Sequence, residues 1–132
     1  MKLFIENGTL VEDLKKIFTN CYPFLKIELY KKQFTNGFSV VKKAPLASAL
    51  NLAKFINAAK KITIDINNNI TVAELENQFE DIGLMAEVFR KSGNIWIETT
   101  LTNNWTLQQQ NAEGEEISRH FSNKKIDSSN LN

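Results

Sequence analysis

Two stretches of the chain show the same succession of hydrophobic and polar positions. In each, a short alternating segment, residues 2–6 or 62–67, predicts a strand, and apolar residues three and four apart then predict a short helix. A Thr-x-x-Glu sequence begins each helix, at Thr9 and at Thr71, and is typical of a capping box. The apolar stripes of the two helices consist of Leu10, Leu14, Ile17 and Phe18 in the first and of Val72, Leu75, Phe79 and Ile82 in the second.

A second strand, a turn and a returning strand follow each helix. Residues 25–32 align without a gap on residues 84–91, and Thr35-Asn36-Gly37 and Ser92-Gly93 predict the turns after them. A helix over 46–59, with Pro45 at its start, and a shorter helix near 106–112 end the two stretches. The pattern predicts an α+β fold: a single sheet of about six strands with helices on one face, built by internal duplication of a β-α-β-β-α unit.

The chain divides into one folded unit and a polar end. We expect a single α+β domain over residues 1–112, with pseudo-repeats over about 1–60 and 61–112. Residues 113–132 form a polar C-terminal tail with little to bury, so we expect partial disorder there, and the stretch from Glu115 to Phe121 could add one helical turn.

The overall composition excludes several classes of protein. The chain has 132 residues, of which 42% are hydrophobic and 23% charged, as in one globular domain. No apolar run approaches the roughly 20 residues of a membrane-spanning helix, and residues 1–7 are interrupted too soon for a signal peptide, so we expect a cytoplasmic protein with no membrane contact. A single cysteine, Cys21, and a single histidine, His120, exclude an internal disulfide framework and a zinc finger.

The charges are divided unevenly between the two halves. Residues 1–61 hold 11 lysines and four acidic residues, a net charge of +7, whereas residues 62–132 hold five basic and 11 acidic residues, a net charge of −6. Such asymmetry favours docking on an acidic partner, or pairing of two copies through opposite halves. Neutralisation of the two halves within one globule is the alternative.

Residue types that carry catalysis are sparse in this sequence. A catalytic cysteine needs a nearby base, but His120 lies in the polar tail, so Cys21 is interpreted as a small hydrophobic residue at a helix end. The five glycines are scattered and form no phosphate-binding loop. The acidic residues between 74 and 81 fall mainly on the exposed side of a helix. We therefore expect no catalytic residue, no cofactor and no metal ion.

One predicted hairpin gathers aromatic and acidic side chains on one surface. A two-residue turn at Ser92-Gly93 places Phe89 opposite Trp96 and Glu87 opposite Glu98, with all four on the sheet face away from the core. Glu28 and Tyr30 repeat this pattern, an acidic residue followed two positions later by an aromatic one, in the first stretch. Aromatic side chains give large contact area at low entropic cost, so this face is the predicted binding surface.

Several segments of the chain also resemble known sequences. The relevant segments are Ala73-Glu74-Leu75, the run from Val88 to Thr99, Trp105-Thr106-Leu107, Gln110-Asn111 and Tyr22-Pro23-Phe24-Leu25-Lys26-Ile27-Glu28. With these segments, the chain up to about Gly114 resembles a group of small uncharacterised proteins from Bacteroidetes-type bacteria. The resemblance implies no activity, cofactor or catalytic residue.

These observations favour a non-catalytic protein-interaction or assembly module. Its binding residues are predicted to be Tyr30, Phe89, Trp96, Glu87 and Glu98, and its partner is a second copy, in a homodimer, or another protein. Three alternatives stay open at this point. The C-terminal segment covers the rings, for example through Trp105; the chain binds a small ligand or acts as an enzyme through Glu87 and Glu98; or the lysine-rich first half binds nucleic acid, against which the acids among the rings argue.

Overall fold

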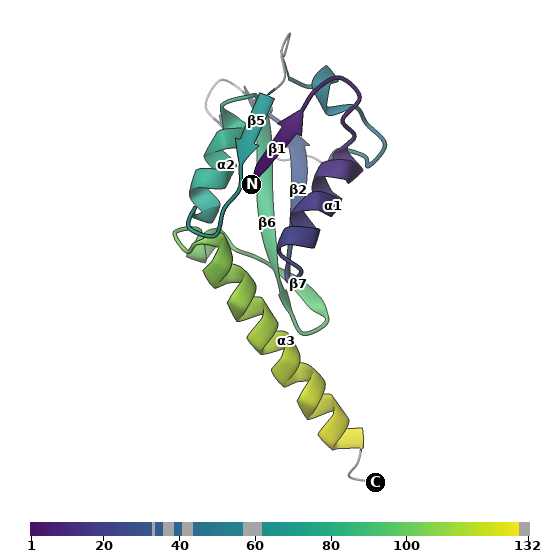
Figure 1. The fold of residues 1–132 in the computed structure, drawn as a ribbon, viewed down its shortest axis with the longest axis vertical. Helices are drawn as coiled ribbons and strands as arrows, with labels where there is room; N and C mark the ends of the chain where they lie inside the picture. Colours follow the sequence, from purple (N-terminus) through teal and green to yellow (C-terminus); the bar gives the residue numbers. More distant parts are fainter. Residues whose placement is uncertain (33, 36–38, 41–43, 57–61, 130–132) are drawn as a thin grey trace.

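The computed structural model describes residues 1–32, 34–35, 39–40, 44–56 and 62–129. The elements in chain order are β1 (Lys2–Ile5), α1 (Val11–Cys21), β2 (Leu25–Lys31), β3 (Phe34–Thr35), β4 (Ser39–Val40), η1 (Leu52–Lys54), β5 (Ile62–Asp65), α2 (Val72–Glu80), β6 (Leu84–Ser92), β7 (Ile95–Glu98), η2 (Thr100–Thr102) and α3 (Leu107–Ser129). Figure 1 labels the three α-helices and the longer strands. The turn predicted at Thr35-Asn36-Gly37 falls partly outside the described residues.

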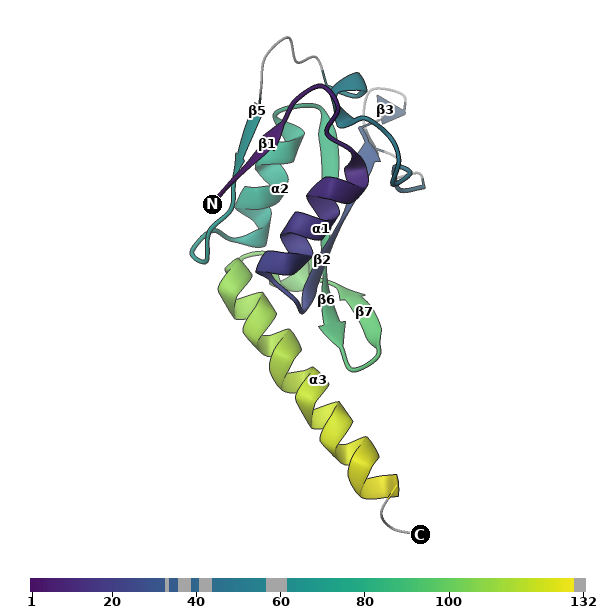
Figure 2. The same cartoon turned by 45° about the vertical axis from the view of Figure 1, so that its right-hand side comes forward.

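The α+β class is confirmed, but the predicted single sheet of six strands is wrong. Within the described residues the strands form three separate antiparallel sheets: β1 with β5, β2-β6-β7 in that order, and β3 with β4. The β1–β5 pair lies across the core from β2 and β6, with α1 and α2 on the two sides (Figures 1 and 2). Alternation along a strand determines which face is buried, but it does not determine which strand is its neighbour.

The predicted duplication of a full β-α-β-β-α unit is also not observed. The order β1-α1-β2 is repeated in β5-α2-β6, but the helix predicted over 46–59 is absent from the described residues 44–56, where only η1 is helical. The reason lies in the main-chain bonds of this segment, which go to its neighbours. Leu46 N–H donates to Leu29 O at 2.8 Å, Leu50 O accepts from Val11 N–H at 3.0 Å, and Leu52 N–H donates to Thr9 O at 2.8 Å.

The hydrophobic core lies between the three-stranded sheet, the two helices and the β1–β5 pair. Phe18 of α1 and Phe79 of α2 are completely buried in it. The sheet contributes Leu25, Ile27, Leu29, Leu84, Ala86 and Val88, and the β1–β5 pair contributes Leu3, Ile5 and Ile64. All the sheet residues named belong to one face, so the opposite face of β2-β6-β7 does not contribute to this core.

Of the two predicted capping threonines, Thr71 caps its helix through its side chain and Thr9 does not. Thr71 Oγ1 accepts a hydrogen bond from Glu74 N–H at 3.1 Å, so the start of α2 is confirmed. In α1 the N-cap is Leu10 rather than Thr9, and Asp13 Oδ2 accepts the Leu10 N–H at 3.1 Å. Thr9 Oγ1 accepts instead from Glu6 N–H at 3.2 Å, within the turn before the helix.

The C-terminal segment is one long helix rather than a short helix and a tail. α3 continues from Leu107 through Ser129, and its C-terminal part extends away from the rest of the molecule (Figures 1 and 2). Good helix formers and a Glu115–Arg119 ion pair one turn apart support this continuation. None of the helices in the described residues has the length and apolar character that crossing a membrane requires.

Candidate protein-binding site

The β6–β7 hairpin turns one residue later than the sequence predicted. The pairs are Ser92 with Ile95, Lys91 with Trp96, and Phe89 with Glu98, so Gly93 and Asn94 form the turn. Gly93 has φ of +69°, a conformation that favours glycine. The pairing therefore differs from the predicted one by two residues, and an even shift leaves every side chain on its predicted face.

The five predicted site residues share the sheet face opposite the core, but they differ in exposure. Trp96 is 37% exposed and Glu98 is exposed, whereas Phe89 is half-buried. Tyr30 and Glu87 are only 7% and 9% exposed. The accessible part of the predicted surface is therefore the end near β7, not the end near Tyr30.

Glu87 faces Glu28 rather than Glu98 across the strands. The two glutamates are direct partners in the β2–β6 register, where like charges repel. Lys15, from α1, reaches Glu28 with Nζ–O distances of 3.0 and 3.1 Å, and Lys26 Nζ lies 3.9 Å from Glu28 Oε1. These cations offset the repulsion, so the predicted Glu87–Glu98 acid pair is replaced by a charge-balanced cluster.

Lys26 is the residue of this sheet face that the sequence reasoning missed. Its Nζ lies 5.1 Å from the centre of the Phe89 ring and 5.3 Å from that of Trp96, in a cation–π arrangement with both. The signal was present in the alternation along β2, which puts Lys26 on the same face as Glu28 and Tyr30. We call Lys26, Phe89, Trp96 and Glu98 the aromatic face.

Trp105 lies on the other side of the sheet and does not cover the aromatic face. The guanidinium of Arg90 lies 5.4 Å from the Trp105 ring, and Arg90 Nη1 donates to Gln110 Oε1 at 2.8 Å. Arg90 alternates with Phe89 along β6, so its side chain is on the opposite face. α3 thus packs on the core side of the sheet, against Arg90 and Phe24, where Gly114 permits close approach.

A second feature lies at the edge of the same sheet. β6 pairs with β2 from Leu84 to Arg90, but with β7 only from Phe89 to Ser92. Thr99 Oγ1 donates to Val88 O at 2.8 Å, and this side-chain bond ends the β7 ladder. In the described part of the chain, no strand pairs with Leu84–Val88 on the side away from β2. We call this stretch the free edge of β6.

The direction of the main-chain groups follows from the ladder. In an antiparallel pair, alternate residues direct their N–H and C=O groups to opposite sides. Val88 O meets Thr99 on the β7 side, whereas Lys91 N–H donates to Phe24 O at 2.9 Å on the β2 side. Leu84 and Ala86, at even spacing from Val88, therefore direct their main-chain groups to the free edge.

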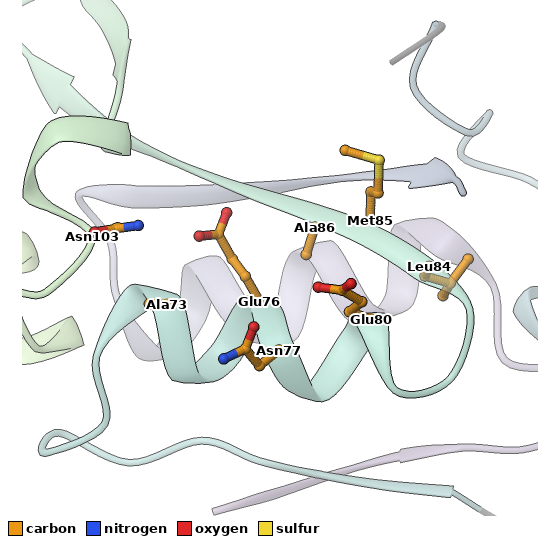
Figure 3. A pocket seen from close by; sticks show the side chains of 8 residues that line it. All are labelled: Ala73, Glu76, Asn77, Glu80, Leu84, Met85, Ala86 and Asn103. Carbon is orange, nitrogen blue, oxygen red and sulfur yellow. The ribbon is translucent and has the colours of Figure 1, made fainter. Parts of the chain in front are cut away.

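A groove of about 260 Å³ lies between this free edge and α2 (Figure 3). Glu76 and Glu80 rise from α2 towards β6, and Asn103 stands at one end (Figure 3). The lining residues are Ala73, Glu76, Asn77, Glu80, Leu84, Met85, Ala86 and Asn103. Glu80 Oε1 also accepts from Lys32 Nζ at 3.2 Å, so Lys32 lies beside the acidic wall of the groove.

The groups considered for catalysis are spread over separate elements. Cys21 is exposed at the end of α1, and His120 is exposed on α3. Among the residues that the structure describes, no three His, Cys, Asp or Glu side chains gather as a metal ion would need. Family models, curated proteins and solved structures were compared with the chain, and none matched.

Proposed function

We propose that this chain is a non-catalytic protein-interaction module that binds an extended segment of another protein along the free edge of β6. The observation that carries the proposal is the unequal length of the strands beside β6. A strand added at Leu84–Val88 would continue the line of β7 and complete the third strand of the sheet. Extended peptides commonly bind in this way, because main-chain hydrogen bonds provide affinity and alternate side chains provide specificity.

The free edge supplies the main-chain part of such a complex. Leu84 and Ala86 offer two N–H donors and two C=O acceptors, each net hydrogen bond contributing about 0.5–1.5 kcal/mol. Unpaired strand edges are also the positions where another chain pairs most readily. The short stretch favours reversible rather than permanent binding.

The surroundings of the edge define the chemistry of the partner. Side chains of an added strand point alternately towards α2 and towards the open sheet face. On the α2 side they meet Glu76 and Glu80, which favour lysine or arginine. On the open face they lie near Met85, whose side chain is on the face of β6 that also carries Phe89. Leu101, 98% exposed in η2 beside the groove residue Asn103, adds apolar contact area.

Selection of peptides tests the proposal. A random peptide library displayed on phage is selected against the full chain, and the binders are mapped by chemical-shift changes of the backbone amides. We expect binders rich in Lys, Arg and β-branched residues, shift changes centred on residues 84–88, and slower hydrogen exchange at the Ala86 amide. A library without binders, or binders that map elsewhere, would contradict the proposal.

Three variants distinguish the edge from a general electrostatic effect. Ala86→Pro removes an N–H that faces the free edge and not β2, so it should abolish peptide binding while the β2–β6 ladder remains. The double variant Glu76→Lys/Glu80→Lys should weaken binding about tenfold or more, because it places like charges beside the basic peptide. Glu74→Lys, on the same helix but outside the groove, is the matched control and should bind normally.

A further inference from the structure

A separate surface lies on α3, away from the free edge of β6. Glu113, Glu116, Ile117, His120 and Phe121 line an open hollow of about 500 Å³ along one side of this helix. Their spacing of three and four residues puts them in one stripe, which we call the outer stripe. Phe121 is 43% exposed and Ile117 is half-buried, so the centre of the outer stripe is apolar and its flanks are polar.

The outer stripe is held in a fixed orientation by the contacts of α3 with the hairpin. A Cβ atom at Gly93 would lie 2.9–3.3 Å from ring atoms of Phe121, so the ring packs directly on the β6–β7 turn. Gly114 packs as closely, since its own Cβ would lie 3.0 Å from Phe24 Cβ and 3.2 Å from Lys91 O. Ile95, two residues beyond Gly93 in the same hairpin, is a further apolar side chain that is 57% exposed.

The charges along α3 run from acidic to basic. Glu113, Glu115 and Glu116 precede Arg119, Lys124 and Lys125, and Asp127 follows them. Glu115 and Arg119 form an ion pair within the helix, whereas Glu113 and Glu116 belong to the outer stripe. Two such helices side by side in opposite directions bring the acidic part of each against the basic part of the other, whereas parallel helices would bring like charges together.

We propose that the outer stripe is a self-association site, at which two copies of this chain pair through antiparallel α3 helices. A two-fold axis relates the two copies, so the same contact forms twice: Glu113 and Glu116 of each copy face the basic segment of the other. Ile117 and Phe121 form the apolar centre of the contact. The projection of α3 beyond the body supports a second copy as occupant, because a single helix exposed on most sides has little tertiary packing to stabilise it (Figures 1 and 2).

Light scattering after gel filtration, over a range of protein concentrations and salt, measures this association with the full chain. We expect a dimer that dissociates on dilution, and that weakens with added salt because its charged flanks are exposed. Glu113→Lys/Glu116→Lys should raise the dissociation constant about tenfold or more, and so should Lys124→Glu/Lys125→Glu. An equimolar mixture of these two variants should again form dimers.

The combined variant, with all four charges reversed in one chain, should again form the dimer, because in antiparallel helices each reversed acidic segment meets a reversed basic one. In parallel helices each charge would face its own copy, so neither double variant would weaken the dimer relative to the unaltered chain. Glu76→Lys/Glu80→Lys, in the groove at β6, should dimerise normally, so failure of peptide binding and failure of self-association are separate results. A strict monomer at every concentration, a dimer unaffected by charge reversal, or no recovery in the combined variant would overturn the proposal. Circular dichroism establishes that each variant keeps its helix content.

Discussion

Gly114 offers a direct test of how closely α3 packs on the sheet. Replacing it with alanine adds one Cβ atom, which would lie 3.0 Å from Phe24 Cβ, 3.1 Å from Arg90 Cγ and 3.2 Å from Lys91 O. These separations are shorter than ordinary van der Waals contact, and neither Phe24 Cβ nor a main-chain oxygen moves away by a side-chain rotation. The helix or the strand must therefore shift by a few tenths of an ångström.

The magnitude follows from two opposing effects. Alanine is about 0.8–1.0 kcal/mol better than glycine in the interior of a helix. Overpacking of a tight contact typically costs about 1–3 kcal/mol. The larger cost is expected to prevail here because three atoms are approached at once, so Gly114→Ala should lower the free energy of unfolding by about 1 kcal/mol. For a chain of this length, that corresponds to a fall in Tm of roughly 4 °C.

Thermal and urea unfolding, followed by circular dichroism, measure the change. Ala112→Gly, at an exposed position of the same helix, is the control, and it should cost about 1 kcal/mol through helix propensity alone. If Gly114→Ala instead stabilises the chain by about the amount that Ala112→Gly removes, then α3 does not approach Phe24 and Lys91 as described. The contacts that orient the outer stripe on α3 would then not exist as described.

Two further predictions concern the ends of other elements. Thr99→Val removes the donor to Val88 O, so it should lower the free energy of unfolding, measured in urea, by about 1–2 kcal/mol. The control is Thr100→Val at the exposed neighbouring position, which should change the free energy of unfolding by less than about 0.5 kcal/mol. Equal effects of the two substitutions would refute the role of the Thr99 hydroxyl. Burial, and secondarily the neighbouring Cys21, raises the pKa of the Tyr22 hydroxyl above its usual 10.0. As pH rises past 10.0 the unfolded chain therefore loses the hydroxyl proton before the folded chain does, and the free energy of unfolding should fall. Tyr22→Phe should lack that part of the decline, and a stability difference between the two chains that does not vary with pH would contradict the assignment.

The sequence was most informative about individual elements. The alternation in residues 84–91 and the apolar spacing from Val72 to Ile82 correctly predicted β6 and α2, because both patterns report burial against a neighbouring layer. The same patterns did not determine strand partners. β1 and β5 each have one buried face, and this is equally compatible with a place in a large sheet and with the separate pair that forms.

The two failed helix boundaries have different causes. Residues 46–56 have helical apolar spacing, but the main chain there bonds to β2 and to the start of α1, so tertiary contacts override local preference. The end of α3 was placed too early because residues 113–129 are polar. Polarity indicates little burial, but it does not oppose helix formation where it comes from Glu, Arg and Lys.

The candidate site was only partly accessible from the sequence. The face shared by Phe89 and Trp96 followed from counting along a strand, and it survived a shift of two residues in the hairpin. The burial of Tyr30 and Glu87, and the free edge of β6, depend on where other segments lie in space. No periodicity in residues 84–88 distinguishes a strand paired on both sides from one paired on a single side.

The early end of β7 has a consequence for selectivity. Because the Thr99 hydroxyl occupies the carbonyl that the next pair would use, a visiting segment has only the space from Leu84 to Val88 before it meets the molecule's own chain. The length of a bound peptide therefore offers little discrimination between partners. Under the proposed binding mode, selectivity must come from the few peptide side chains that contact α2. Substitutions in the part of α2 that lines the groove would change which proteins bind without disturbing the hydrophobic core.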